Sequence, residues 1–116
     1  MKNDNIIVEK SLNFAIRIVN LSKHLKTQMN ENVLSKQILR SGTSIGANVR
    51  EAIYGQSKAD FTSKMSIALK ETAETEYWLE LLQRTNYISQ IQYKSIMNDC
   101  SEIAKIITTI VKNSKS

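Results

Sequence analysis

The sequence predicts an all-α protein that folds as one antiparallel, up-down-up-down four-helix bundle. Its 116 residues include no proline and only three glycines, so few positions interrupt a helix. Apolar residues recur every three or four positions in four blocks, which short polar segments separate. Long helices joined by short turns fold back on their neighbours. We therefore assign residues 1–116 to a single domain.

The first helix is predicted over residues 5–29, where one apolar face repeats at helical spacing. We expect the inward side of this helix to carry Val8, Leu12, Ala15, Val19, Ser22, Leu25 and Met29. The polar letters "NEN" at 30–32 then supply capping candidates before the next helix.

The second helix is predicted over residues 32–54, and its periodicity continues through a glycine-containing stretch, "SGTSIGAN". A phosphate-binding loop would need a preceding strand and a terminal Gly-Lys-Ser or Gly-Lys-Thr, and the sequence has neither. Glycine within a helix costs about 1 kcal/mol relative to alanine, so a close packing contact should offset it. We interpret this stretch as a helix-packing motif, against another helix of the bundle or another subunit, made of Gly42, Ile45, Gly46 and Asn48.

Two capping boxes predict where the last two helices begin. Ser57 with Asp60 opens a helix that should reach about residue 85, and Ser89 with Gln92 opens another that should reach about residue 112. Between them, Asn86 is a candidate for a left-handed helix cap. The inward positions on these two helices are Phe61, Met65, Ala68, Thr72, Leu79, Leu82, Ile96, Cys100 or Asp99, Ile103, Ile107 and Ile110.

Carboxylates gather on the predicted third helix, and Glu76 falls on its inward stripe. Paired carboxylates can do acid–base chemistry or, with histidines, hold metals. The di-iron bundles need Glu-x-x-His on two helices, but the only histidine, His24, lies on the first helix. We therefore expect structural ion pairs, in which Arg40 or Arg50 reaches across the bundle. Their predicted partners are Glu71, Glu74 or Glu76.

The segments "LRSGTSIGANVREA" and "SKADFTSKMSIALKETAETEYWLELLQRTNYI" resemble those of the bacterial 23S ribosomal RNA intervening-sequence proteins. The same superfamily includes Avd, the accessory variability determinant of diversity-generating retroelements. The resemblance is strong over residues 34–88, although Arg50 stands where many relatives have a neutral or acidic residue. The matching positions are Arg40, Ser44, Ile45, Asn48, Glu51, Phe61, Ala68, Leu69 and Glu74.

This resemblance implies an antiparallel four-helix bundle without known catalytic activity. It also implies assembly into a ring-like homopentamer with a basic surface. In Avd-like relatives that surface engages nucleic acid and a reverse transcriptase.

The net charge of +5 is predicted to lie at one end of the bundle. Residues 1–17, 44–67 and 103–116 should meet there and hold nine bases against four acids, whereas the remaining residues hold seven of each. Such an end would attract a polyanion, although lysines at helix C-termini also serve solubility and complement the helix dipole. The candidate nucleic-acid contacts are Lys10, Arg50, Lys58, Lys64 and Lys112.

A second pattern on the first helix alternates basic and apolar residues: Lys10, Arg17 and His24 are interleaved with apolar side chains. Nucleic-acid contact is one interpretation, and we favour a subunit interface, because apolar groups outside the core need a cover. The predicted interface residues, including one aromatic residue of the third helix, are Ile7, Phe14, Leu21 and Trp78.

No set of residues predicts an enzyme, a cofactor or a metal site. One cysteine and one histidine cannot form a four-ligand zinc site, and Cys100 has no activating base, so we interpret it as a core residue. No apolar run is long enough for a membrane span, and the N-terminus lacks the apolar core of a signal peptide. These features favour a cytoplasmic protein without a membrane anchor.

The sequence thus predicts a non-enzymatic, homo-oligomeric bundle that binds RNA or DNA through its basic end. The alternative is a structural adaptor whose ring docks a protein partner, with the charge serving solubility alone.

Overall fold

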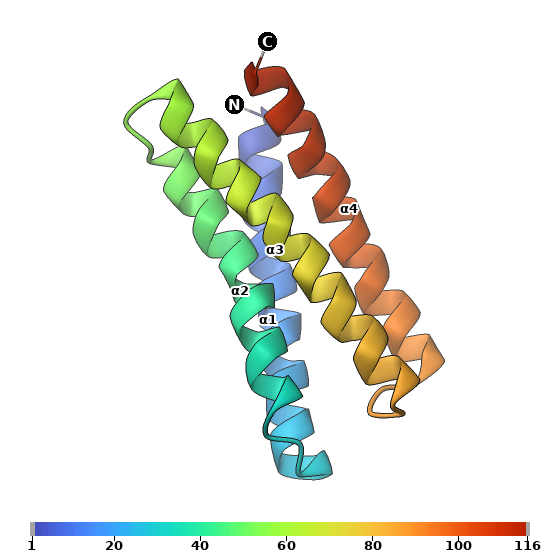
Figure 1. Ribbon diagram of the computed structural model, residues 1–116. Helices are drawn as coiled ribbons and strands as arrows, with labels where there is room; N and C mark the ends of the chain where they lie inside the picture. The colour runs from blue at the N-terminus through green and yellow to red at the C-terminus, as the bar shows by residue number, and fades with distance from the viewer. Residues whose placement is uncertain (1, 116) are drawn as a thin grey trace.

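The computed structural model describes residues 2–115, with side chains from residue 6 onward, and all its regular structure is helical. The four helices are α1 (Lys2–Met29), α2 (Leu34–Ile53), α3 (Lys58–Arg84) and α4 (Gln90–Lys115). Figure 1 shows successive helices running in opposite directions through a molecule with extents of 44 × 21 × 19 Å. The predicted all-α four-helix bundle is confirmed.

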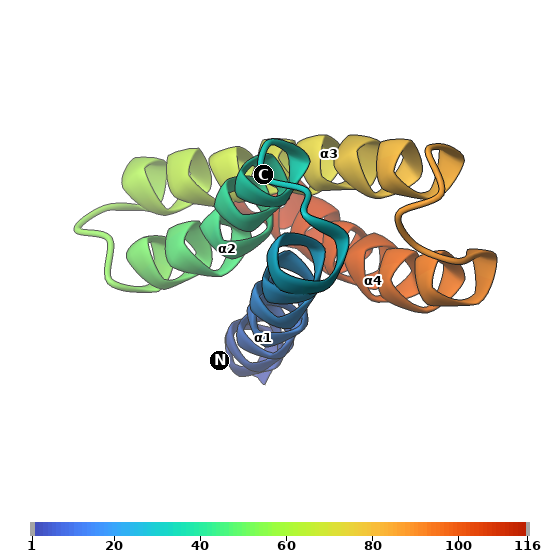
Figure 2. The same cartoon turned by 90° about the horizontal axis from the view of Figure 1, so that it is seen from below.

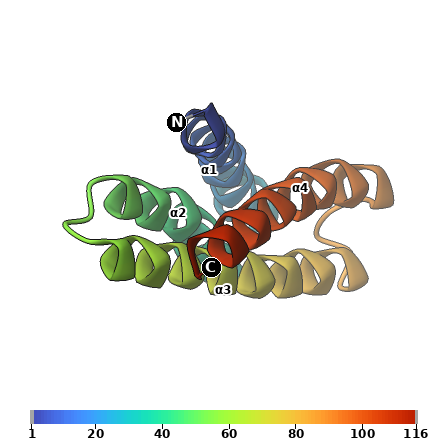
Figure 3. The same cartoon turned by 90° about the horizontal axis from the view of Figure 1, so that it is seen from above.

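Each helix packs on its neighbour in sequence, and α1 also contacts α4, which closes the bundle. The helices are not parallel: the end views in Figures 2 and 3 show α1 inclined to both α3 and α4. In Figure 1, α1 and α4 approach each other at the end that holds both termini and separate toward the other end. The α1–α4 seam is therefore the most open contact between helices.

Side-chain caps fix the helix boundaries in the second half of the chain. The backbone N–H of Asp60 donates to Ser57 Oγ over 3.0 Å, and the Gln56 N–H donates to the Asp60 carboxylate over 3.3 Å. At the start of α4, the side chains of Ser89 and Gln92 each accept the other's backbone N–H, at 3.1 and 2.9 Å. Both predicted capping pairs start the helices where the sequence indicates.

The turn between α3 and α4 depends on one left-handed residue. Asn86 has a φ of 68°, and the Tyr87 N–H donates to the Leu82 carbonyl oxygen over 2.9 Å. This is the hydrogen bond that closes a Schellman motif, so the prediction for Asn86 is confirmed.

The first turn uses an acidic cap. Asn30 is left-handed, with a φ of 53°, and it is followed by Glu31, which is 9% exposed. The Glu31 carboxylate accepts the Ser35 N–H over 2.8 Å, and the Glu31 carbonyl oxygen accepts the Ser35 hydroxyl at the same distance. A carboxylate at this place also complements the positive end of the α2 dipole.

The core runs the length of the bundle and contains side chains from all four helices. Its largest fully buried members are Ile7, Phe14, Ile18, Leu25, Ile38, Ile45, Val49, Met65, Leu79, Leu82, Ile103 and Ile107. The few hydroxyls inside it are paired: Thr75 Oγ1 donates to Ser41 Oγ over 3.0 Å and joins α3 to α2. No buried side-chain nitrogen or oxygen in the described residues lacks a hydrogen-bond partner.

The glycines of α2 pack against α1 of the same chain. A Cβ placed on Gly42 would lie 2.7 Å from Ile18 Cγ1, and one on Gly46 would lie 3.3 Å from the Ser11 carbonyl oxygen. Neither glycine has a positive φ, so their role is close approach and not turn formation. Of the other two residues of the motif, Ile45 is fully buried, and Asn48 donates to the Ser44 carbonyl oxygen within α2.

The inward face of α1 differs from the predicted one. The side chains that enter the core are those of Ile7, Phe14, Ile18 and Leu25. The expected core residues Leu12 and Met29 are 42% and 38% exposed, and Val8, Ala15 and Val19 are half-buried. The prediction was wrong because α1 carries two apolar stripes, and the one that faces the other helices is rotated from the predicted one.

Candidate nucleic-acid interface

The helix directions bring a group of basic side chains to one end of the bundle, the upper end in Figure 1. Arg50 lies in the last turn of α2, Lys58 is the first residue of α3, and Lys112 lies in the last turn of α4. All three are exposed, as are Lys105 and Lys115 of α4. We call these five residues the basic end.

Two of the predicted contact residues are ion-paired instead. Lys64 Nζ lies 3.4 Å from Glu51 Oε1, and Lys10 pairs with Glu102 across the α1–α4 seam. Within the part of the chain that the structure describes, Arg50 and Lys112 have no acidic partner within 4.0 Å. The capacity to attract an anion therefore rests more on Arg50 and Lys112 than on Lys10 and Lys64.

The predicted division of charge between the two ends needs a correction in the middle of the bundle. Arg17 Nη1 lies 2.6 Å from Asp99 Oδ2, and its other terminal nitrogen donates to Ser95 Oγ over 3.1 Å. Asp99 and Glu102 belong by residue number to the neutral end, yet they neutralise Arg17 and Lys10. The division was wrong there because long side chains reach across a boundary drawn by residue number.

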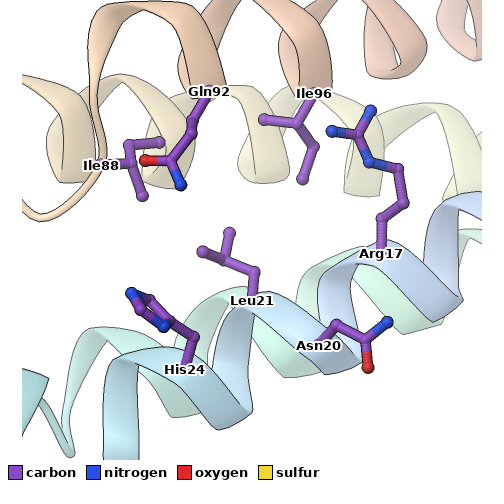
Figure 4. Close-up of a pocket in the computed structure, with 7 residues that line it drawn as sticks. All are labelled: Arg17, Asn20, Leu21, His24, Ile88, Gln92 and Ile96. Atoms are coloured by element: carbon purple, nitrogen blue, oxygen red, sulfur yellow. The ribbon is translucent and has the colours of Figure 1, made fainter. Parts of the chain in front are cut away.

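A hollow of about 290 Å³ lies where α1 and α4 separate, and Figure 4 shows the side chains around it. The α1 side contributes Arg17, Asn20, Leu21 and His24. The opposite side, from the α3–α4 turn and α4, contributes Ile88, Gln92 and Ile96. We call this hollow the α1–α4 pocket. Its lining combines apolar side chains with polar or basic ones, and none of these residues is acidic.

An ion-pair cluster joins α2 to α3 and does not involve the α1–α4 pocket. Arg40 pairs with Glu74 and also lies 3.2 Å from Glu71 Oε2, so the expected reach of Arg40 across the bundle is confirmed. The Trp78 indole N–H donates to Glu74 over 3.1 Å, and this bond, followed by Arg40, lowers the pKa of the Glu74 carboxyl. Glu76 is half-buried, and the Ser101 hydroxyl donates to it over 3.5 Å.

Two of the four predicted interface residues do not lie on the surface. Ile7 and Phe14 are 0% and 1% exposed, so they cannot anchor a second subunit, and this assignment was wrong. The physical reason is the rotated face of α1, which turns both side chains into the core of their own chain. Leu21 and Trp78 are half-buried and pack against that core.

The exposed apolar side chains of α1 include residues that the sequence pattern places inside. Leu12 is 42% exposed and Ile16 is 53% exposed, next to the half-buried Val8, Ala15 and Val19. We call these five residues the outer face of α1. The sequence carries a usable signal: more apolar positions on α1 than one core-facing stripe can hold.

We also searched the described residues for a metal site, a reactive cysteine and a membrane-spanning helix. They contain no group of three or more His, Cys, Asp or Glu side chains that could hold a metal ion. Cys100 is fully buried, and burial, with smaller effects from Glu76 and Asp99, raises the pKa of its thiol to about 12. No described helix is both long and apolar enough to cross a membrane.

Comparisons with known proteins agree with this architecture. A protein of unknown function from the S23 ribosomal protein family of Bacteroides thetaiotaomicron, solved at 1.70 Å, superposes with a TM-score of 0.94. It shares 62% sequence identity over 95% of this chain and 98% of its own. None of the curated proteins matches. Residues 3–109 match the family described as 23S rRNA-intervening sequence protein, and the chain therefore belongs to that family.

Proposed function

We propose that this protein is a non-enzymatic, homo-oligomeric bundle that binds RNA or DNA through its basic end. The observation that carries the proposal is that the end of α2, the start of α3 and the end of α4 lie at one end of the bundle. They carry Arg50, Lys58, Lys112 and Lys115, with Lys105 about 15 Å before the end of α4. The family description, which refers to 23S rRNA, supports RNA as the polyanion. Contacts of this kind bind phosphate and carry little sequence information by themselves.

Binding across a salt series tests the proposal. Each lysine or arginine that neutralises a phosphate releases a counterion, so affinity falls linearly with the logarithm of salt concentration. We expect a labelled structured RNA and a matched DNA duplex to bind with such a slope. The double variant Arg50→Gln, Lys112→Gln should lower the slope by about 2, because each substitution removes one side chain that neutralises a phosphate.

A matched control removes the same charge elsewhere. Lys23 and Lys36 are exposed and lie near the α1–α2 turn, at the opposite end. The variant Lys23→Gln, Lys36→Gln has the same net charge as the test variant and should keep the wild-type slope. Equal losses in both variants would show that total charge matters and not the basic end. Absence of binding at low salt would contradict the proposal and leave the adaptor function.

The homo-oligomer part of the proposal is supported by the outer face of α1. Leu12 and Ile16 expose apolar surface, and Leu12 lines a shallow groove together with Val8 and with Thr43 and Ala47 of α2. Apolar surface of this kind is stabilised when a second subunit covers it. A second copy of this chain is the proposed cover, and the pentameric number rests on the family resemblance.

Sedimentation equilibrium tests the oligomer. The chain mass is 13.2 kDa, so a pentamer has five times that mass, about 66 kDa. We expect Ile16→Asp to shift the population to smaller species, because a buried charge without a partner is costly. Ile91→Asp is the control, since Ile91 is 82% exposed on α4. A wild-type monomer at all concentrations, or an oligomer unaffected by Ile16→Asp, would contradict this part.

We further propose a cytoplasmic location. The single cysteine, Cys100, is free and buried, which suits a reducing compartment.

A further inference from the structure

We propose that the α1–α4 pocket holds one unstacked base of a single-stranded RNA or DNA segment whose backbone continues to the basic end. The inference rests on the proposed nucleic-acid function and adds to it a contact with a base. It assigns a role to Arg17, Leu21 and His24, which belong to the alternating stripe of α1 and which the basic end does not use.

The size of the pocket favours a small planar group. Its volume of about 290 Å³ lies at the lower limit of sites for small molecules, which begin at roughly 300 Å³. Leu21 of α1 and Ile96 of α4 face each other across it and form apolar walls (Figure 4). Such walls can contact the face of a base, whereas a phosphate would lose its hydration there.

The two ends of the pocket carry planar side chains. Arg17 and His24 are seven residues apart, about 10 Å along the helix axis, and Figure 4 shows them at opposite ends of the hollow. Unstacked bases pack on imidazole rings and on guanidinium planes. Asp99 and Ser95 already hold the Arg17 guanidinium in place, so it meets a base as a fixed plane and not as a free charge.

Amide groups supply the polar contacts that the edge of a base requires. The side-chain carbonyl oxygen of Gln92 accepts the Ser89 N–H, which leaves its NH₂ group as a donor beside the pocket. Asn20 is exposed on the rim and offers both a donor and an acceptor. Together these amides offer both donors and an acceptor, which are the groups that a base edge presents in return.

The pocket and the basic end can belong to one path. Twenty residues separate Gln92 from Lys112 on α4, about 30 Å along the helix. A stacked strand covers that distance in about nine nucleotides at roughly 3.4 Å each. The acids along the seam, Asp99 and Glu102, are neutralised by α1, so they do not oppose a passing phosphate backbone.

The test compares two single-stranded oligonucleotides of about 12 nucleotides at one salt concentration, one with bases and one fully abasic. Both carry the same phosphates, so the ratio of their affinities isolates the contribution of the bases. We expect the wild type to prefer the strand with bases by about tenfold. This value lies within the range that alanine substitution gives for one base stacked on an aromatic side chain. In the variant Asn20→Ala, His24→Ala the preference should disappear while the salt slope stays unchanged.

Two further variants make the result specific. Asn98→Ala, Gln37→Ala removes two exposed uncharged polar side chains away from the pocket and should keep the preference. His24→Trp, made in the otherwise wild-type protein, offers a larger stacking plane. It should keep or increase the preference for the strand with bases. Retained preference in Asn20→Ala, His24→Ala, or equal wild-type affinity for the two strands, would overturn the pocket while leaving the basic end intact. Failure of both strands to bind at low salt would overturn the proposed function as well.

Discussion

At Gly42, the backbone of α2 lies directly against a branched side chain of α1. A Cβ there would meet three atoms of Ile18, and the nearest is 2.7 Å away. One of the three is the Ile18 Cβ itself, at 3.2 Å, which cannot move without its helix. The close spacing of α1 and α2 at this point therefore requires glycine, which has a hydrogen atom in place of Cβ.

We predict that Gly42→Ala destabilises the protein. Overpacking of a core costs about 1–3 kcal/mol, and the better helix propensity of alanine returns about 1 kcal/mol. The expected net loss in the free energy of unfolding is up to about 2 kcal/mol, measured by urea denaturation. Gly46→Ala is the control: its Cβ would lie 3.3 Å from the Ser11 carbonyl oxygen, so we expect a change within about 0.5 kcal/mol. Equal effects at both positions would contradict this account.

Cys100 is a residue whose chemistry is suppressed by its position. The thiol donates weakly to the Thr72 carbonyl oxygen, over 3.7 Å, and water cannot reach it. Because burial raises the pKa to about 12, the nucleophilic thiolate does not form near neutral pH.

We predict that Cys100 makes stability decrease as the pH rises from about 8.5. In the unfolded chain the thiol ionises near a pKa of about 8.5, whereas in the folded protein burial raises that pKa to about 12. Between these two pKa values the unfolded state therefore binds fewer protons than the folded state. Each pH unit in this range lowers the free energy of unfolding by about 1.4 kcal/mol. Between about pH 8 and pH 10, the free energy of unfolding of the wild type should fall by about 2 kcal/mol more than that of Cys100→Ala. Chemical denaturation at each pH measures both. Parallel pH profiles for the two proteins would contradict the prediction.

Among the elements, α2 was predictable from sequence and α1 only in part. The apolar positions of α2, such as Ile38, Ile45 and Val49, form one stripe, so the periodicity identifies both the helix and its inward face. On α1, two stripes compete, and only contact with the other helices decides between them. A periodic pattern can therefore predict a helix without predicting its rotation about its own axis.

Helix ends were more predictable than helix rotation, because caps use residues close in sequence. Ser57 and Ser89 each accept a hydrogen bond from a backbone N–H three residues later, as their spacing predicts. The Glu31 cap was less predictable, since its carboxylate reaches Ser35 four residues later in a turn that also needs a left-handed Asn30.

We predict that Ser57→Ala destabilises the bundle by about 1 kcal/mol, because it leaves the Asp60 N–H at the start of α3 without an acceptor. Ser63→Ala makes the same chemical change at an exposed position inside α3 and should be neutral or slightly stabilising. Thermal and urea denaturation of the two variants give the comparison. A loss at Ser63 as large as that at Ser57 would show that the cap has no special role.

For the whole molecule, the α1–α4 seam distinguishes this bundle from a uniformly packed one. Two exposed ion pairs, Lys10 with Glu102 and Arg17 with Asp99, cross the seam, and Arg17 also lines the α1–α4 pocket. Neither pair was predicted, because residues 82 to 92 positions apart cannot be matched from sequence without the angles between helices. The α1–α4 pocket was unpredictable for the same reason.

We predict that these pairs contribute little to stability. In the Lys10–Glu102 pair, the two side chains are 43% and 53% exposed, and exposed pairs contribute about 0.2–1 kcal/mol. A double-mutant cycle with Lys10→Ala and Glu102→Ala should give a coupling energy in that range at low salt. The coupling should shrink at about 1 M salt, where the screening length is about 3 Å. A coupling well above about 1 kcal/mol that resists salt would show that the seam depends on its charges.

The contact between the first and last helices also bears on how the four helices are connected along the chain. Of the helix contacts in the described residues, only α1–α4 joins elements far apart in sequence, and both ends of the described chain lie at the same end of the bundle. A flexible linker between those ends, with a new opening at the α1–α2 turn, would make α1–α4 a local hairpin. The long loop closure that now accompanies formation of the α1–α4 seam would then accompany formation of the α1–α2 contact. The order of the helices along the chain is thus separable from their arrangement in space.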